Sequence, residues 1–518
     1  MRKFLLSSFI ILSVAHAQTP VIQWQRCFGS PDIDQCRGVT KLPDGGVVAV
    51  GVSAMDGGDV TGNHGSGDMW VMRTDESGNL LWQKSIGGNG GDAGDCVIIN
   101  SEGHIIVTGT TYTPNNGDVT GNHGTADLWM VRIDTSGNFL QAKCFGGSST
   151  EFGNSVCQTP DGGYLVAGIV NSANGDVTGQ HGGGDGWLLK MDSLWNLQWS
   201  HCYGGSKYDG FNQVLITSDG NYLCVGFSMS DDGDVTDHRG DSLTMDSWVV
   251  MTDAAGNLLW QKSFGGSDND MASGVAETTQ HQFLLAAMAA SNDSDVTGNH
   301  GGQDLWLVKF DSAGIIWQKC FGGTSVENGL KILANSDSGI TVFSGAGSLN
   351  GDVTGGHGSN DYWLIHTDTA GNILWDKCFG GSQWDIPNEG FAWDDSTFML
   401  AGWTFSTNGD ITFTNGNEDY WLVKVRATLL TSASETPFSS LLPKFYPNPS
   451  NGWIKFLLEE STRFPFQITI RDMMGKELKS FIAENESSYD LDLAVGCYLV
   501  EIKNENGISS CSKLMICE

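Results

Sequence analysis

The chain has 518 residues, of which 17% are charged, and its formal net charge is −33. With 70 glycines and 18 tryptophans it is too aromatic for a disordered protein and too rich in turn residues for a helical one. The excess of acid repels phosphate backbones, so we expect no nucleic-acid partner.

The N-terminus has the pattern of a secretory signal peptide. Met-Arg-Lys is followed by an apolar run from Phe4 to Val14 and by Ala15-His16-Ala17. The run is too short to span a membrane, which takes about 20 apolar residues. We therefore predict a signal peptide over residues 1–17, a mature chain from Gln18, and no transmembrane segment.

A repeat dominates the rest of the chain. An Asp, one further residue and a Trp open an apolar run seven times, at intervals of 57 to 61 residues. The tryptophans are Trp70, Trp129, Trp187, Trp248, Trp306, Trp363 and Trp421.

Each unit contains four strand-like runs separated by turn residues. In the third unit they are 140–145, 154–159, 164–170 and 186–192, and Asp161-Gly162-Gly163 forms a hairpin signal between two of them. Four antiparallel strands repeated seven times predict an all-β chain with a seven-bladed β-propeller over residues 21–425.

The ends of the repeat region predict that the ring closes. A strand around Trp24 precedes the first unit, and the last unit ends at Val425 without the equivalent strand. The N-terminal strand can complete the last blade as its outermost strand, which an open solenoid would not require. The strand after each Gly-Gly-Ser would then line the central channel.

The strongest candidate site is a carboxylate in every unit at the start of the predicted innermost strand. We expect these acids to surround one mouth of the channel and bind a ligand or a cation, for which calcium is the candidate. The alternative is that each acid caps its own turn. They are Asp34, Asp92, Glu151, Asp209, Asp270, Glu327 and Asp385.

Other repeated residues favour structural roles. Paired loop acids, such as Asp59 and Asp68, lack the spacing of a calcium loop, and we interpret them and the loop histidines as turn residues. Cysteines alternate with serine at one repeat position, which indicates packing rather than a disulfide. Strand tryptophans such as Trp82 and Trp260 resemble the docking tryptophans of quinoprotein propellers, but packing between blades explains them better.

The repeat is lost after Val425. Residues 426–441 have the composition of a linker, and 442–518 contain short alternating strands. This last segment resembles the C-terminal sorting domain of type IX secretion cargo from Bacteroidetes. The resemblance rests on Tyr446, Pro447, Asn448, Pro449, Gly496, Tyr498 and Lys513.

The resemblance implies a small β-sandwich that binds the type IX secretion machinery at the outer membrane. Together with the signal peptide it predicts a secreted or cell-surface protein. We expect a non-catalytic binding or adhesion propeller with a glycan or protein ligand, because the polar residues repeat and no catalytic motif appears. A polysaccharide hydrolase or lyase and a structural surface-coat component stay open as alternatives.

Overall fold

The computed structural model describes residues 20–241, 243–335 and 339–427, together with strands and short segments between 444 and 516. The chain divides into a compact unit over Ala17–Leu429 and a second unit that contains Leu430–Glu518. The described residues contain strands and turns and no helix. The predicted signal peptide and most of the predicted linker lie outside them.

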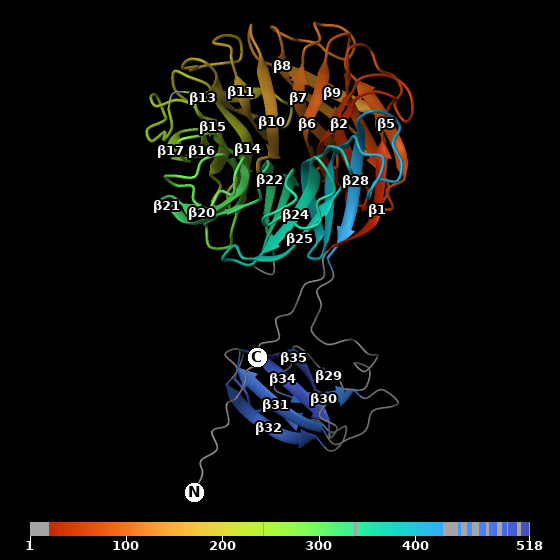
Figure 1. Cartoon of the computed structure of the whole chain (residues 1–518), viewed down its shortest axis with the longest axis vertical. Helices are drawn as coiled ribbons and strands as arrows, with labels where there is room; N and C mark the ends of the chain where they lie inside the picture. Colours follow the sequence, from red (N-terminus) through yellow and green to blue (C-terminus); the bar gives the residue numbers. More distant parts are fainter. Residues whose placement is uncertain are drawn as a thin grey trace. The chain divides into compact units, whose positions relative to one another are not determined.

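The first unit is a ring of seven four-stranded antiparallel sheets (Figure 1). Blade 1 holds β2 (Asp34–Lys41), β3 (Val47–Ser53), β4 (Asp68–Thr74) and β5 (Leu80–Ile86). Blade 2 holds β6 (Asp92–Ile99), β7 (Ile105–Thr111), β8 (Asp127–Ile133) and β9 (Phe139–Phe145). Blade 3 holds β10 (Glu151–Gln158), β11 (Tyr164–Val170), β12 (Asp185–Met191) and β13 (Leu197–Tyr203).

Blades 4 to 7 repeat this order. Blade 4 holds β14 (Asp209–Ile216), β15 (Tyr222–Ser228), β16 (Asp246–Thr252) and β17 (Leu258–Phe264). Blade 5 holds β18 (Asp270–Glu277), β19 (Phe283–Ala289), β20 (Asp304–Asp311) and β21 (Gly314–Phe321). Blade 6 holds β22 (Glu327–Ala334), β23 (Ile340–Ala346), β24 (Asp361–Thr367) and β25 (Ile373–Phe379). Blade 7 holds β26 (Asp385–Asp394), β27 (Thr397–Thr404), β28 (Asp419–Arg426) and β1 (Val21–Phe28).

The seventh blade confirms the predicted closure. Its strand order is β1-β28-β27-β26, so the N-terminal strand lies outermost. Trp24 pairs with Lys424, and Cys27 pairs with Trp421. β28 continues to Arg426 and Ala427 is buried, so the propeller extends slightly into the predicted linker.

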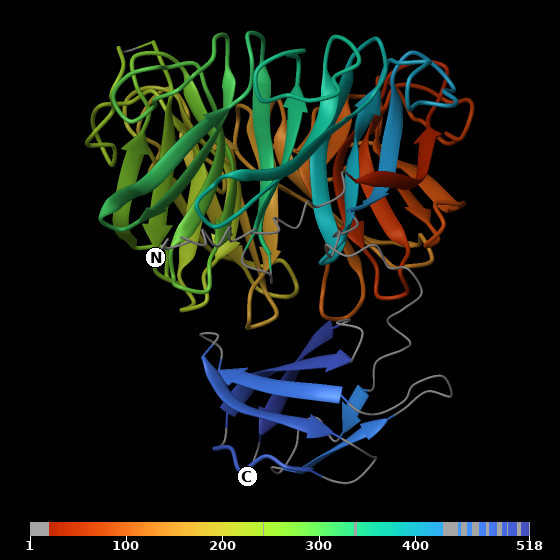
Figure 2. The same cartoon turned by 60° about the horizontal axis from the view of Figure 1, so that its bottom comes forward.

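The innermost strands β2, β6, β10, β14, β18, β22 and β26 surround the centre of the ring (Figure 1). Each begins at its acid, so the third unit's strand starts at Glu151, three residues before the predicted start. Figure 2 shows the strand ends gathered on two opposite faces. One face carries the blade-to-blade connections and the long loops between the second and third strands, as predicted; we call it the loop face. The other, the hairpin face, carries the remaining turns.

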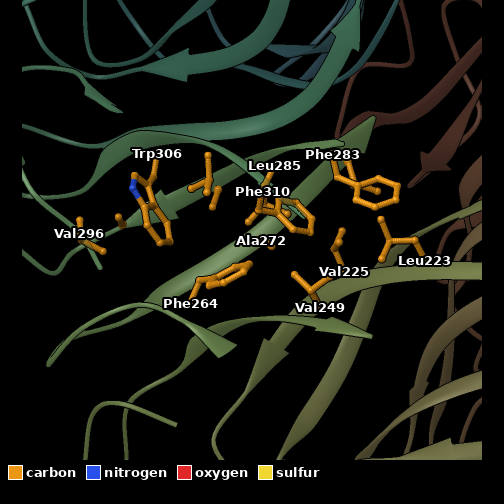
Figure 3. Packing of buried hydrophobic residues seen from close by; sticks show 14 of the residues in the cluster. Leu223, Val225, Val249, Phe264, Ala272, Phe283, Leu285, Val296, Trp306 and Phe310 are labelled. Carbon is orange, nitrogen blue, oxygen red and sulfur yellow. The ribbon is translucent and has the colours of Figure 1, made fainter. Parts of the chain in front are cut away.

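The core lies between neighbouring blades. The seven repeat tryptophans have no exposed surface, because each lies at the middle of a four-stranded sheet covered by the next one. Figure 3 shows one such layer, in which Trp306 and Phe310 of blade 5 lie in one buried cluster with Val225 and Val249 of blade 4. The nine propeller cysteines are free thiols, which agrees with the packing role.

The C-terminal unit contains two antiparallel sheets. One is formed by β29 (Lys444–Tyr446), β30 (Trp453–Leu457) and β33 (Tyr489–Asp490). The other, in spatial order, is formed by β32 (Glu477–Ala483), β31 (Phe466–Asp472), β34 (Gly496–Asn504) and β35 (Ser509–Ile516). Ile468, Ile470 and Val500 from adjacent strands of this sheet are buried, and they form its apolar face.

Candidate functional site

The seven acids of the candidate ring are all buried. Asp92 is typical: its Oδ2 accepts hydrogen bonds from Gly88 N at 2.9 Å and from Thr113 Oγ1 at 2.7 Å. The equivalent backbone N–H donates to the other six acids, Asp34, Glu151, Asp209, Asp270, Glu327 and Asp385. The carboxylates therefore cap the connection that leads into each blade, and their side chains are buried. Binding of a ligand or of calcium by this ring stays a prediction.

A second carboxylate lies across each junction. At the first junction, a Cβ on Gly87 would lie 2.5 Å from Asp92 Oδ2 and 3.1 Å from Asp68 Oδ1, so only glycine fits between the two blades. Asp68 Oδ1 is buried and has no hydrogen-bond partner in the described part of the chain. Burial of this kind raises the carboxyl pKa, and that of the equivalent Asp419 rises to about 6.

The loop acids and histidines complete these junctions. Asp118 Oδ2 accepts a hydrogen bond from Gly87 N at 3.2 Å, and His64 Nδ1 lies 2.6 Å from Asp68 Oδ2. The same contacts recur around the ring, which agrees with a structural role for both sets. Within the described residues, no group of three or more His, Cys, Asp or Glu side chains is arranged to hold a metal ion.

The channel wall is built from the residues that alternate with the buried acids. Along β2, Asp34 and Cys36 are buried, whereas Gln35 and Arg37 are half-exposed and face the channel. The pairing register shifts immediately after Cys36, and all seven innermost strands shift at the equivalent place. Each shift is a β-bulge, which adds one residue to the channel wall. The bulged residues are Arg37, Asp95, Asn154, Asn212, Ser273, Leu330 and Asn388.

The bulged residues are three asparagines and four residues of other types, and they enclose a cavity of about 150 Å³. Arg37 Nη1 lies 2.8 Å from Asp95 Oδ1, and Lys331 Nζ lies 3.3 Å from Glu389 Oε1. Three bulged asparagines donate to a carbonyl of the next blade, for example Asn212 Nδ2 to Ala272 O at 2.8 Å. The waist of the channel is therefore polar. Its charged side chains form ion pairs, and hydrogen bonds connect neighbouring blades there.

The mouth on the loop face is asymmetric. Its rim is formed by the residue before each acid, and three of these are apolar and exposed: Ile33 (41%), Val326 (38%) and Trp384 (56%). They immediately precede the innermost strands β2, β22 and β26, and β26 packs against both of the others. The remaining rim positions are Gly91, Thr150, Tyr208 and Asn269.

A second layer follows the same asymmetry. The backbone carbonyl that binds each acid's N–H belongs to Gln303, Asn360 and Glu418 beside the apolar rim residues. At the other four positions it belongs to the small residues Gly67, Ala126 and Gly184 and to Met245. Gln35 Nε2 donates to Glu418 Oε2 at 2.6 Å. Three exposed apolar rim residues and three polar residues behind them thus lie together over three neighbouring blades, a mixture typical of a binding surface. We call this surface, from Val326 through Trp384 to Ile33, the mouth patch.

The repeat pattern does not predict the mouth patch, because its residues do not recur from unit to unit. The signal lay one position before each acid, where the seven units differ.

One serine, one histidine and one carboxylate meet on the hairpin face, without the geometry of a catalytic relay. His281 Nδ1 lies 3.0 Å from Ser218 Oγ and 3.1 Å from Glu277 Oε1. A relay needs the serine and the carboxylate on different ring nitrogens, so that the histidine can accept the serine proton. Here both use Nδ1, and Ser218 Oγ lies 2.7 Å from Glu277 Oε1.

Two sorting-motif residues have defined surroundings in the C-terminal unit. Tyr498 pairs with Leu514 and donates from its hydroxyl to Ala494 O at 2.7 Å. Tyr446 pairs with Lys455 at the end of β29. Gly496 and Lys513 lie on β34 and β35, and Pro447, Asn448 and Pro449 lie outside the described residues.

Comparison with known families identifies the tail. Residues 444–517 match the secretion system C-terminal sorting domain. This tail indicates export to the cell surface or medium through the type IX machinery. No helix in the described residues is long and apolar enough to cross a membrane.

The chain is also distantly similar to several known proteins. A stretch of 201 residues is 25% identical to the regulatory protein FlaEY of Caulobacter vibrioides, and covers 34% of this chain and 20% of that protein. The Pan2 WD40 domain of Neurospora crassa is 8% identical, with a TM-score of 0.41, over 79% of this chain and 96% of that one. YCF48 bound to D1 peptide is 9% identical, with a TM-score of 0.39, over 80% and 99%.

Proposed function

We propose that the protein is a non-catalytic binding or adhesion protein, exported by the type IX secretion system of a Bacteroidetes bacterium, whose propeller holds an extracellular glycan or protein at the mouth patch. The sorting tail supports the export route. The loss of sevenfold symmetry at the channel mouth carries the binding proposal, because elsewhere on the loop face most polar residues recur from blade to blade.

The mouth patch favours binding over catalysis. Trp384 and its apolar neighbours offer a surface for stacking and desolvation, and Gln35 and Glu418 offer hydrogen bonds. The ionised groups of the channel waist below are paired with each other, as Arg37 with Asp95, which leaves them poorly placed as general acids or bases. A structural coat component would not need one half of the mouth to differ from the other.

An array experiment tests the proposal. The mature full-length protein would be applied to glycan and protein arrays with calcium and with a chelator, and the bound glycans would be analysed for cleavage. We expect a restricted set of ligands bound and left intact. Cleaved or eliminated glycan products would establish the enzyme alternative, and an array without any ligand would leave the coat-component interpretation.

A further inference from the structure

One turn on the hairpin face is a residue shorter than its equivalents. Blades 1, 2, 4 and 6 join their last two strands through Asp-x-x-Gly-Asn, whereas blade 5 runs from Asp311 through Gly314 directly into Ile315. In the longer turns the Asn donates hydrogen bonds to both carboxylate oxygens of the Asp. In blade 1, Asn79 N donates to Asp75 Oδ1 at 2.9 Å and Asn79 Nδ2 donates to Asp75 Oδ2 at 2.8 Å. Asp311 accepts instead from Ala313 N at 2.8 Å through Oδ1, and within the described chain its Oδ2 has no such partner.

The longer turns cover a tryptophan of the preceding blade. A Cβ on their glycine would lie 2.8 to 3.0 Å from the indole ring in three of these contacts. The pairs are Gly78 with Trp24, Gly137 with Trp82, and Gly371 with Trp317. The equivalent Gly314 has nothing within 4 Å. The missing residue therefore removes from Trp260 of β17 the glycine contact that Trp24, Trp82 and Trp317 have.

A cavity of about 360 Å³ lies at this place, between blades 4 and 5. Trp260, Met251 and Phe283 form its apolar wall. Asp219, Glu277 and Asp311 bring three carboxylates to it. His281, whose Nδ1 lies 3.1 Å from Glu277 Oε1, is the one basic residue of the lining, which contains no lysine or arginine. A hydrogen bond from Thr217 lowers the pKa of Asp219, which is therefore ionised at neutral pH.

We propose that this pocket, the Trp260 pocket, binds a small organic ammonium cation. The face of an indole attracts a cation held within about 6 Å of its centre, and tryptophan does so best among the aromatic residues. The free oxygen of Asp311 and the two other carboxylates add charge of the right sign at the rim of the same cavity. The net charge of −33 raises the local concentration of cations further. A neutral sugar can donate hydrogen bonds to the carboxylates but gains no charge attraction from them.

Choline is a suitable probe, and 3,3-dimethylbutan-1-ol is its uncharged isostere. Titration of the mature full-length protein by calorimetry should show saturable choline binding that weakens as sodium chloride is added. The isostere should bind at least about tenfold more weakly, because it lacks the charge that the indole and the carboxylates recognise. No choline binding, or equal binding of the isostere or of glucose, would overturn the proposal.

Two variants locate the binding. Trp260→Leu should weaken choline binding at least about tenfold, and Trp317→Leu, the matched change under a covered tryptophan, should leave it unchanged. Insertion of Asn between Gly314 and Ile315 restores the longer turn, so it should abolish choline binding and preserve the melting temperature. Choline binding that persists in the insertion variant would show that the short turn does not create the site. If Trp260→Leu does not fold, the insertion variant decides.

Discussion

Substitution of one buried acid tests whether these carboxylates stabilise the fold by capping their turns, and Asp209 is the position we choose for it. Its Oδ2 accepts from Gly205 N at 2.8 Å and from Ser230 Oγ at 2.7 Å, and Oδ1 accepts from Met229 N at 3.2 Å. Asp209→Asn preserves the shape but replaces one acceptor oxygen with a donor. The serine hydroxyl can turn to a new partner, whereas a buried backbone N–H cannot.

The expected cost follows from that orphaned N–H. Leaving one buried amide without an acceptor costs about 1–3 kcal/mol, so the free energy of unfolding should fall by about that amount in guanidinium denaturation. Asp231→Asn is the control, because this exposed residue makes only a surface ion pair with Lys207, at 3.4 Å. The control should lose at most about 1 kcal/mol.

Calcium separates the two interpretations of the acids. Capping predicts the same melting temperature for the wild type in calcium and in chelator. If Asp209→Asn were as stable as the control, the capping account would be refuted. If calcium also raised the wild-type melting temperature and not that of Asp209→Asn, the cation ring would be reinstated.

Three further predictions concern the ring and its export. Deleting Val21–Gly29 should lower the free energy of unfolding far more than deleting nine residues of the 426–441 linker, because β1 completes blade 7; equal losses in urea denaturation would contradict the closure. Burial raises the pKa values of Asp270, Asp385 and Asp419 to about 6, above the ordinary 3.8. These carboxyls therefore stabilise the fold below pH of about 4 and lose that contribution as the pH rises through 6, so calorimetry should show a higher melting temperature near pH 5 than near pH 7.5. A chain truncated after Ala427 should remain in the periplasm of the native host, and surface labelling of the truncated form would disprove the sorting role.

The seven-bladed ring of the propeller could be predicted because seven units share the same sequence pattern. Trp70 and its six counterparts set the period, and the strand around Trp24 supplied the one piece that the last unit lacked. Repetition of this kind averages out local exceptions, so blade number and strand order followed from spacing alone.

Whether the acidic side chains point into the channel or into the blade junctions could not be predicted in the same way. A strand alternates its sides every residue, so Asp34 and Gln35 are equally good candidates for the channel until the first buried residue is known. The bulge at Arg37 then shifts the alternation within the same strand. The mouth patch could not be predicted for a different reason, since no other unit has a tryptophan at the position of Trp384. The Trp260 pocket could have been predicted, because the turn from Asp311 to Gly314 is one residue shorter than its equivalents in the sequence.

The most direct test of the binding account is the affinity of Trp384→Ala for the strongest ligand found on the arrays. Its matched control is Phe139→Ala, which removes an exposed aromatic side chain from the outer strand β9. The account predicts a dissociation constant raised at least about tenfold by Trp384→Ala and unchanged by Phe139→Ala, both variants melting as the wild type does. Equal affinity in the wild type and both variants would show that the ligand does not bind at the mouth patch.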